Sequence, residues 1–103
     1  MMIRKIKHNT HPGEILKEEV IIANNLTITA AAQLLDIPRG VLSNVLNRKA
    51  PVTPILASRI AKVFGGNSEI WIRLQLSFDM REAELFSKNL KLKPYKAKRK
   101  HTA

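Results

Sequence analysis

The chain contains no cysteine, which excludes disulfide frameworks, thiolate zinc sites and cysteine nucleophiles. No stretch approaches the roughly 18 consecutive apolar residues that a membrane span needs. Residues 1–6 hold no apolar run long enough for a signal peptide. At 103 residues there is room for one small domain, not for a large multi-step enzyme. We therefore expect a soluble, cytoplasmic protein with no membrane partner.

Patterns that support catalysis are also missing. His8, His11 and Glu14 straddle the start of a predicted helix, where their spacing is not fixed, and no fourth metal ligand is evident. Glu18 and Glu19 point in different directions on a helix and do not form a general acid and base pair. There is no glycine-rich phosphate loop. The sequence predicts no enzyme activity, no catalytic residue, no metal and no cofactor.

Acidic residues are scarce: eight Asp and Glu stand against 18 Lys and Arg, for a net charge of +10. Residues 1–7 and 88–103 carry ten basic residues and no acidic one. Residues 27–62 carry five basic residues against one acidic residue, a net of +4. This distribution predicts a polyanionic partner, nucleic acid or acidic lipid. We expect a basic arm at 1–11, a folded domain at 12–87 and a flexible basic tail at 88–103.

Apolar residues recur with a helical period throughout the domain, which predicts an all-α fold of five helices. The first helix should begin at Pro12 and end at Asn24 and Asn25. Its predicted buried stripe is Ile15, Leu16, Val20 and Ala23. The second helix should be capped by the Thr27 hydroxyl and end at Asp36-Ile37-Pro38. The third covers about 38–46, and its predicted buried residues are Leu42, Val45 and Leu46.

The last two predicted helices are marked by caps and glycines. The fourth follows Thr53-Pro54 and ends at Gly65-Gly66. Its predicted buried residues are Leu56, Ile60, Val63 and Phe64. The fifth, capped by Asn67 or Ser68, carries two apolar stripes that do not share a face. They are Ile70, Leu74 and Phe78 on one side and Ile72, Leu76 and Met80 on the other.

A domain this small cannot cover both stripes of the fifth helix. We expect a second copy of the chain to cover the outer stripe, because two-fold dimers are the commonest soluble oligomers. The predicted homodimer interface is Trp71, Ile72, Leu76 and Met80. Trp71 is expected in the core or in this interface rather than as a platform on which bases stack. As an alternative, residues 82–92 could fold back as the cover, with Leu85, Phe86 and Leu90 as its apolar contacts.

The second and third helices, joined by a short turn, form the helix-turn-helix arrangement that reads duplex DNA. Ala32 is small enough to let the two helices cross closely, and Leu35, Ile37, Leu42 and Val45 form the wedge between them. Residues expected to face the major groove are Arg39, Gly40, Val41, Ser43, Asn44 and Asn47. Thr27 and Thr29 at the start of the second helix, with Arg48 and Lys49 after the third, are expected to contact phosphates.

Several motifs resemble the HigA-type antitoxins of the Xre, or lambda-repressor-like, helix-turn-helix family. They are His11-Pro12-Gly13-Glu14-Ile15-Leu16, Leu26-Thr27, Leu35-Asp36-Ile37-Pro38, Asn47 to Thr53, Ala57, Arg59, Ala61, Phe64-Gly65 and Trp71-Ile72-Arg73-Leu74-Gln75. The resemblance implies a five-helix lambda-repressor-like domain, a homodimer and a double-stranded DNA operator upstream of its own toxin–antitoxin operon. It also implies a HigB-like toxin partner, a ribosome-dependent mRNA endonuclease that the antitoxin neutralises by direct binding.

The chain departs from that family pattern at two positions. Asp36 stands where the turn usually carries glycine, and Gly40 lies inside the third helix. Gly40 either lets the backbone approach DNA closely or weakens the helix by up to about 1 kcal/mol relative to alanine. Two other functions stay open: a solitary Xre-type regulator without a toxin partner, and an unspecific RNA- or membrane-surface binder driven by the lysine-rich tail.

Overall fold

The computed structural model describes residues 10–96, and within this range the chain forms helices and no strands. The elements are α1 (Pro12–Ile15), which continues as the π-helix η1 (Leu16–Ile22), then α2 (Ile28–Leu35), α3 (Arg39–Leu46), α4 (Pro54–Phe64) and α5 (Ser68–Ser87). Counting α1 and η1 as one helix, the predicted five-helix all-α fold is confirmed. Most of the predicted arm at 1–11 and the end of the predicted tail lie outside the described residues.

The first helix is capped by His11 rather than by Ser, Thr, Asp or Asn, the usual N-cap residues. The imidazole accepts a hydrogen bond from the Gly13 N–H, and Pro12 occupies the first helical position as predicted. The predicted buried stripe was wrong at Ala23, which is exposed, whereas Ile21 is buried. The reason is the π-helical winding of η1, which places residues five apart on one face and aligns Leu16 with Ile21.

Three helices end on a residue in the left-handed conformation: Asn25, Asp36 and Arg48, with φ of 57°, 57° and 65°. Each end forms a Schellman motif. After α2, for example, the Ile37 N–H donates to the Ala32 carbonyl and the Asp36 N–H to the Gln33 carbonyl. The predicted helix ends at Asn25 and Asp36 are therefore confirmed. Pro38 is the N-cap of α3 and has extended backbone, so α3 begins at Arg39.

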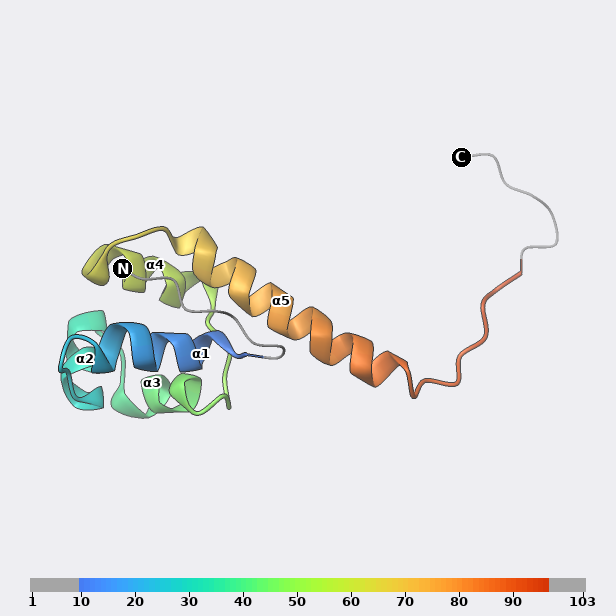
Figure 1. Ribbon diagram of the computed structural model, residues 1–103, viewed down its shortest axis with the longest axis horizontal. Helices are drawn as coiled ribbons and strands as arrows, with labels where there is room; N and C mark the ends of the chain where they lie inside the picture. Colours follow the sequence, from blue (N-terminus) through green and yellow to red (C-terminus); the bar gives the residue numbers. More distant parts are fainter. Residues whose placement is uncertain (1–9, 97–103) are drawn as a thin grey trace.

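The core lies where α1, η1, α2, α3, α4 and the first half of α5 meet (Figure 1). Leu42, Val45 and Leu46 of α3 are buried as predicted, and so are Leu56 and Ile60 of α4. Val63 was predicted to be buried but is exposed, Phe64 is half-buried against the core, and Ala57 is buried although it was not predicted to be. The core face of α4 is therefore centred on Leu56, Ala57 and Ile60, which leaves Val63 at its edge.

Helix α5 begins beside α4, and its second half extends away from the other helices (Figure 1). Its buried face carries Trp71 and Gln75, so the predicted inner stripe was wrong at Ile70, which is exposed. Residues 82–92 do not fold back over the outer stripe: α5 continues to Ser87, and Leu85 and Phe86 are exposed. None of the helices in the described range is both long and apolar enough to cross a membrane.

Candidate nucleic-acid interface

Helices α2 and α3 form a helix-turn-helix unit whose inner faces are fully packed. Ala31, Ala32 and Leu35 of α2 and Leu42 and Val45 of α3 are each at most 2% exposed. The left-handed Asp36 makes the turn between them, and Ile37 packs against the core. Because the two helices share one apolar seam, α3 is held at a fixed angle to the domain.

The outer face of α3 carries the residues predicted to meet DNA bases. Those with exposed side chains or backbone are Arg39, Gly40, Val41, Asn44 and Asn47, and Ser43 is half-buried. The Asn47 amide donates to the Ser43 hydroxyl at 3.3 Å. This surface therefore presents a guanidinium, two amides, a hydroxyl and an aliphatic group along one helix, which is the set of groups that reads base edges in the major groove.

The N-terminus of α2 lies beside the start of α3. The Thr27 hydroxyl caps α2 by accepting from the Ala30 N–H at 3.0 Å, as predicted. The Thr29 hydroxyl accepts from the Arg39 Nε at 3.1 Å, a contact that the sequence did not predict. One predicted phosphate contact and one predicted base contact thus meet on the same edge of the interface.

Arg59 supports the turn between α2 and α3, a role that the sequence pattern did not predict. The Arg59 guanidinium on α4 donates to the carbonyls of Leu35 and Asp36, at 3.0 and 3.3 Å. It also lies 3.9 Å from the Asp36 carboxylate, which is exposed and contributes little. These carbonyls close the last turn of α2, where helix geometry leaves acceptors without partners. Arg59 therefore braces the turn, and no local pattern could have revealed this.

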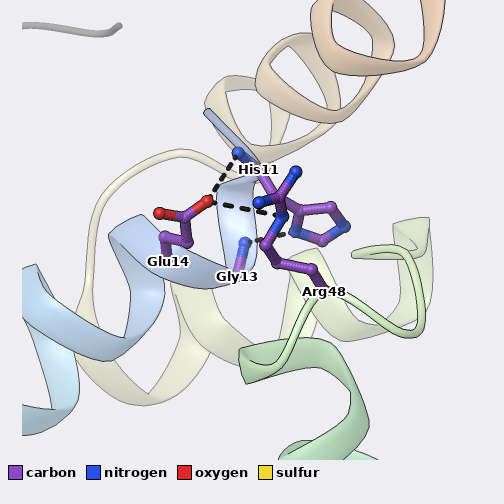
Figure 2. Close-up of polar contacts among 4 residues, drawn as sticks. All are labelled: His11, Gly13, Glu14 and Arg48. Atoms are coloured by element: carbon purple, nitrogen blue, oxygen red, sulfur yellow. Dashed lines mark hydrogen bonds and ion pairs between the residues drawn. The ribbon is translucent and has the colours of Figure 1, made fainter. Parts of the chain in front are cut away.

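Arg48 points away from the outer face of α3 and toward the start of α1 (Figure 2). Its Nε lies 3.5 Å from the Glu14 carboxylate, and its guanidinium carbon lies 5.7 Å from the centre of the Phe78 ring on α5. Its neighbour Lys49 is exposed, and the Arg48 side chain is itself 50% exposed. The two residues predicted to contact the DNA backbone are therefore both accessible, and Arg48 also contacts Glu14 and Phe78.

His11 is buried beside Arg48. Its Nδ1 accepts from the Gly13 N–H at 2.8 Å, and its ring meets the edge of Phe78 at a centroid distance of 4.8 Å. Burial lowers the pKa of His11 below its usual 6.5, and the Arg48 charge lowers it further, while the carboxylates of Glu14 and Asp79 act in the opposite direction. The neutral imidazole is the form that can accept the capping hydrogen bond.

Gln75 fixes the loop between α3 and α4. Its side-chain oxygen accepts from the Val52 N–H at 2.8 Å, and its amide nitrogen donates to the Asp79 carboxylate at 2.9 Å. Because both Gln75 and Val52 are buried, this hydrogen bond satisfies a backbone donor that would otherwise be costly to bury. The loop is thereby tied to α5.

The residues predicted for a dimer interface fall into two environments. Trp71 is only 6% exposed and lies in the core, whereas Leu76 and Met80 are 59% and 51% exposed. Ile72 is half-buried and packs against the core. The accessible outer stripe of α5 therefore consists of Ile72, Leu76 and Met80.

Comparisons with known proteins place the chain among DNA-binding proteins. A family model described as helix-turn-helix matches residues 16–72, which is more than half of the chain. A helix-turn-helix-type transcriptional regulator of Haemophilus influenzae is 39% identical over 84 residues, covering 82% of this chain and 76% of that protein.

Solved structures show the same arrangement. An addiction module antidote protein of a HigA family from Coxiella burnetii is 33% identical with a TM-score of 0.74, covering 86% of this chain and 100% of that one. The Pseudomonas aeruginosa antitoxin HigA, solved with the higBA promoter, has a TM-score of 0.76 at 20% identity, covering 84% and 98% of the two chains. At that identity the likeness shows the fold alone.

Proposed function

The chain belongs to the helix-turn-helix family of DNA-binding regulators and antitoxins, which are not enzymes, and from this premise we propose that it is the antitoxin of a toxin–antitoxin module. It acts in the cytoplasm as a dimer, binds operator DNA sequence-specifically and represses its own operon. It also neutralises an mRNA-endonuclease toxin by direct binding.

The main support for DNA binding is that α3 has one face buried in the core and one face exposed. Leu42 and Val45 anchor the helix in the core, while Arg39 and Asn44 lie exposed on its outer face. An arginine can donate two hydrogen bonds to guanine, and an asparagine can pair with adenine. Gly40, Val41, Ser43 and Asn47 complete the proposed base-reading surface, and Thr27, Thr29 and Lys49 flank it as proposed phosphate contacts.

The outer stripe of α5 supports the dimer. Leu76 and Met80 expose large apolar side chains on a helix whose second half extends away from the rest of the domain (Figure 1). A second copy that packs along Ile72, Leu76 and Met80 would remove this apolar surface from water. Two copies of α3 would then meet successive major grooves about 34 Å apart.

The toxin partner is supported by the name of a relative: the Coxiella burnetii protein, 33% identical along its full length, is described as an addiction module antidote. The Haemophilus influenzae relative is instead named as a transcriptional regulator, and it favours a second candidate, a solitary regulator. Affinity purification of the tagged chain, expressed with its neighbouring reading frames, separates the two. Co-purification of a small ribonuclease that the chain inhibits supports the antitoxin, and its absence supports the solitary regulator.

Selection of duplexes from a random pool tests sequence-specific binding. We expect one two-fold symmetric site, with half-sites centred about one helical turn apart. Arg39→Ala and Asn44→Ala should each weaken binding to the selected duplex by about 1–3 kcal/mol and change binding to random duplex little. Lys49→Ala should weaken both equally. Equal losses on both duplexes for the α3 variants would contradict base reading, and a site without symmetry would contradict the dimer.

A further inference from the structure

The segment His11–Glu14 has no part in the proposed DNA surface, yet it lies against the C-terminal end of α3. A Cβ atom on Gly13 would stand 1.9 Å from the carbonyl oxygen of Val45, which is a backbone atom of α3. Pro12 beside it is fully buried. The first turn of α1 and the last turn of α3 therefore approach more closely than any side chain at Gly13 would permit.

His11 and Glu14, the two ends of the same segment, lie beside Arg48, the second residue after α3. Glu14 pairs with the Arg48 guanidinium at 3.5 Å, and its carboxylate also accepts from the His11 N–H at 3.4 Å (Figure 2). The His11 ring and the Arg48 guanidinium share one partner, the Phe78 ring on α5. Glu14 and Phe78 thus contact the Arg48 side chain, which is 50% exposed, from two other elements of the fold.

Arg48 itself occupies the left-handed position that ends α3. Its N–H donates to the Val45 carbonyl at 3.1 Å, and the next N–H, of Lys49, donates to the Asn44 carbonyl at 2.8 Å. Left-handed backbone disfavours a side chain with a Cβ, and arginine lacks the short polar group that helps Asn or Asp there. The contacts of its side chain with Glu14 and Phe78 offset part of this cost in the folded state.

We propose that residues 11–14 form a clip that fixes the C-terminal end of α3, with Arg48 as a positioning residue held by Glu14 and Phe78 rather than as a phosphate contact. This inference rests on the proposed function, since it explains how α3 is presented to DNA. The clip joins α3 to α1 through Gly13 and Glu14 and to α5 through Phe78. Its loss lets α3 tilt, which weakens base reading but removes no phosphate contact.

The test compares Glu14→Gln, Arg48→Gln and the double variant, with DNA binding measured on the selected and random duplexes at several salt concentrations. Each single variant should reduce the preference for the selected duplex about fivefold to tenfold, the lower end of what one base contact contributes. The slope of log affinity against log salt should not change. The double variant should be no worse than Arg48→Gln alone, because Arg48→Gln already breaks the contact that Glu14→Gln removes.

Two controls accompany these variants. Lys49→Gln removes the neighbouring charge and should weaken binding to both duplexes, with a salt slope reduced by about 0.9. Glu69→Gln removes an equal acidic charge from the first turn of α5 and should leave the preference unchanged. The clip is overturned if Arg48→Gln, like Lys49→Gln, weakens binding to both duplexes and reduces the salt slope. It is also overturned if Glu14→Gln strengthens binding. In either case Arg48 would be a phosphate contact that Glu14 restrains.

Urea unfolding of the same variants measures the contribution of the clip to stability in the absence of DNA. The double variant should unfold at the same urea concentration as Arg48→Gln alone, whereas additive shifts overturn the clip. If the wild-type chain selects no duplex, the proposed function fails, and the unfolding series still decides whether Glu14 and Arg48 act as one unit.

Discussion

Replacing Gly13 with alanine tests the close approach of α1 and α3 in the most direct way. The new Cβ would stand 1.9 Å from the Val45 carbonyl oxygen and 2.9 Å from its carbon. An ordinary contact between carbon and oxygen needs about 3.3 Å, so the two helices must separate by about 1.4 Å. Both clashing partners are backbone atoms or rigidly attached to backbone, so no rotamer change can relieve the contact.

The expected loss of stability combines two opposing effects. Overpacking in a well-packed site costs about 1–3 kcal/mol. Alanine in a helix recovers up to about 1 kcal/mol of backbone entropy relative to glycine. The midpoints of these ranges, about 2 and about 0.5 kcal/mol, lead us to expect that Gly13→Ala lowers the free energy of unfolding by about 1.5 kcal/mol and the melting temperature by about 6–12 °C.

The assay is urea unfolding, followed by far-UV circular dichroism and by the fluorescence of Trp71, which lies in the core. Gly40→Ala is the matched control, because a Cβ on Gly40 meets nothing within 4 Å. It should leave stability unchanged or raise it by up to about 1 kcal/mol. The reasoning is refuted if Gly13→Ala is as stable as the wild type, since the helices would then have room that the structure denies them.

The remaining predictions concern pH, assembly and the tail. Because the pKa of folded His11 is lowered, the unfolded chain takes up a proton below pH 6.5 that the folded chain does not, so stability should fall as pH drops below 6.5. His11→Asn, which keeps a capping acceptor, should flatten that decline in a series of melting curves, and an unchanged decline would assign it to another group. Leu76→Asp or Met80→Asp should shift the sedimentation mass from dimer to monomer without loss of helix. Ser77→Asp, which lies outside the outer stripe, should leave the mass of the dimer unchanged. Deleting residues 88–103 should keep the preference for the selected duplex and make the salt dependence shallower; complete loss of binding would instead favour the unspecific binder.

Most helix boundaries could be predicted because caps are made by neighbouring residues. Thr27, Thr53 and Asn67 accept hydrogen bonds within three residues of themselves, and α2 ends at Asp36, where the run Asp36-Ile37-Pro38 predicted its end. The burial of Leu42 and Val45 followed from helical periodicity, which is also local.

Other features depend on packing between distant parts of the chain, and the sequence carries no local signal for them. The π-helical winding that buries Ile21 instead of Ala23 is one example. The contact of Arg59 with the Leu35 carbonyl spans 24 positions, and the orientation of Arg48 toward Glu14 is set by α1. The sequence pattern assigned Arg59 no role at the turn and predicted a phosphate contact for Arg48, because neither long-range contact has a local signature.

The central claim is that α3 reads duplex DNA with its outer face while its inner face stays in the core. NMR titration of the isotopically labelled full chain with the selected duplex measures this residue by residue. We predict the largest amide shifts at the start of α2 and along the outer face of α3, at Thr29, Arg39, Gly40 and Asn44. Shifts confined to residues 88–96, with α3 unaffected, would contradict the account.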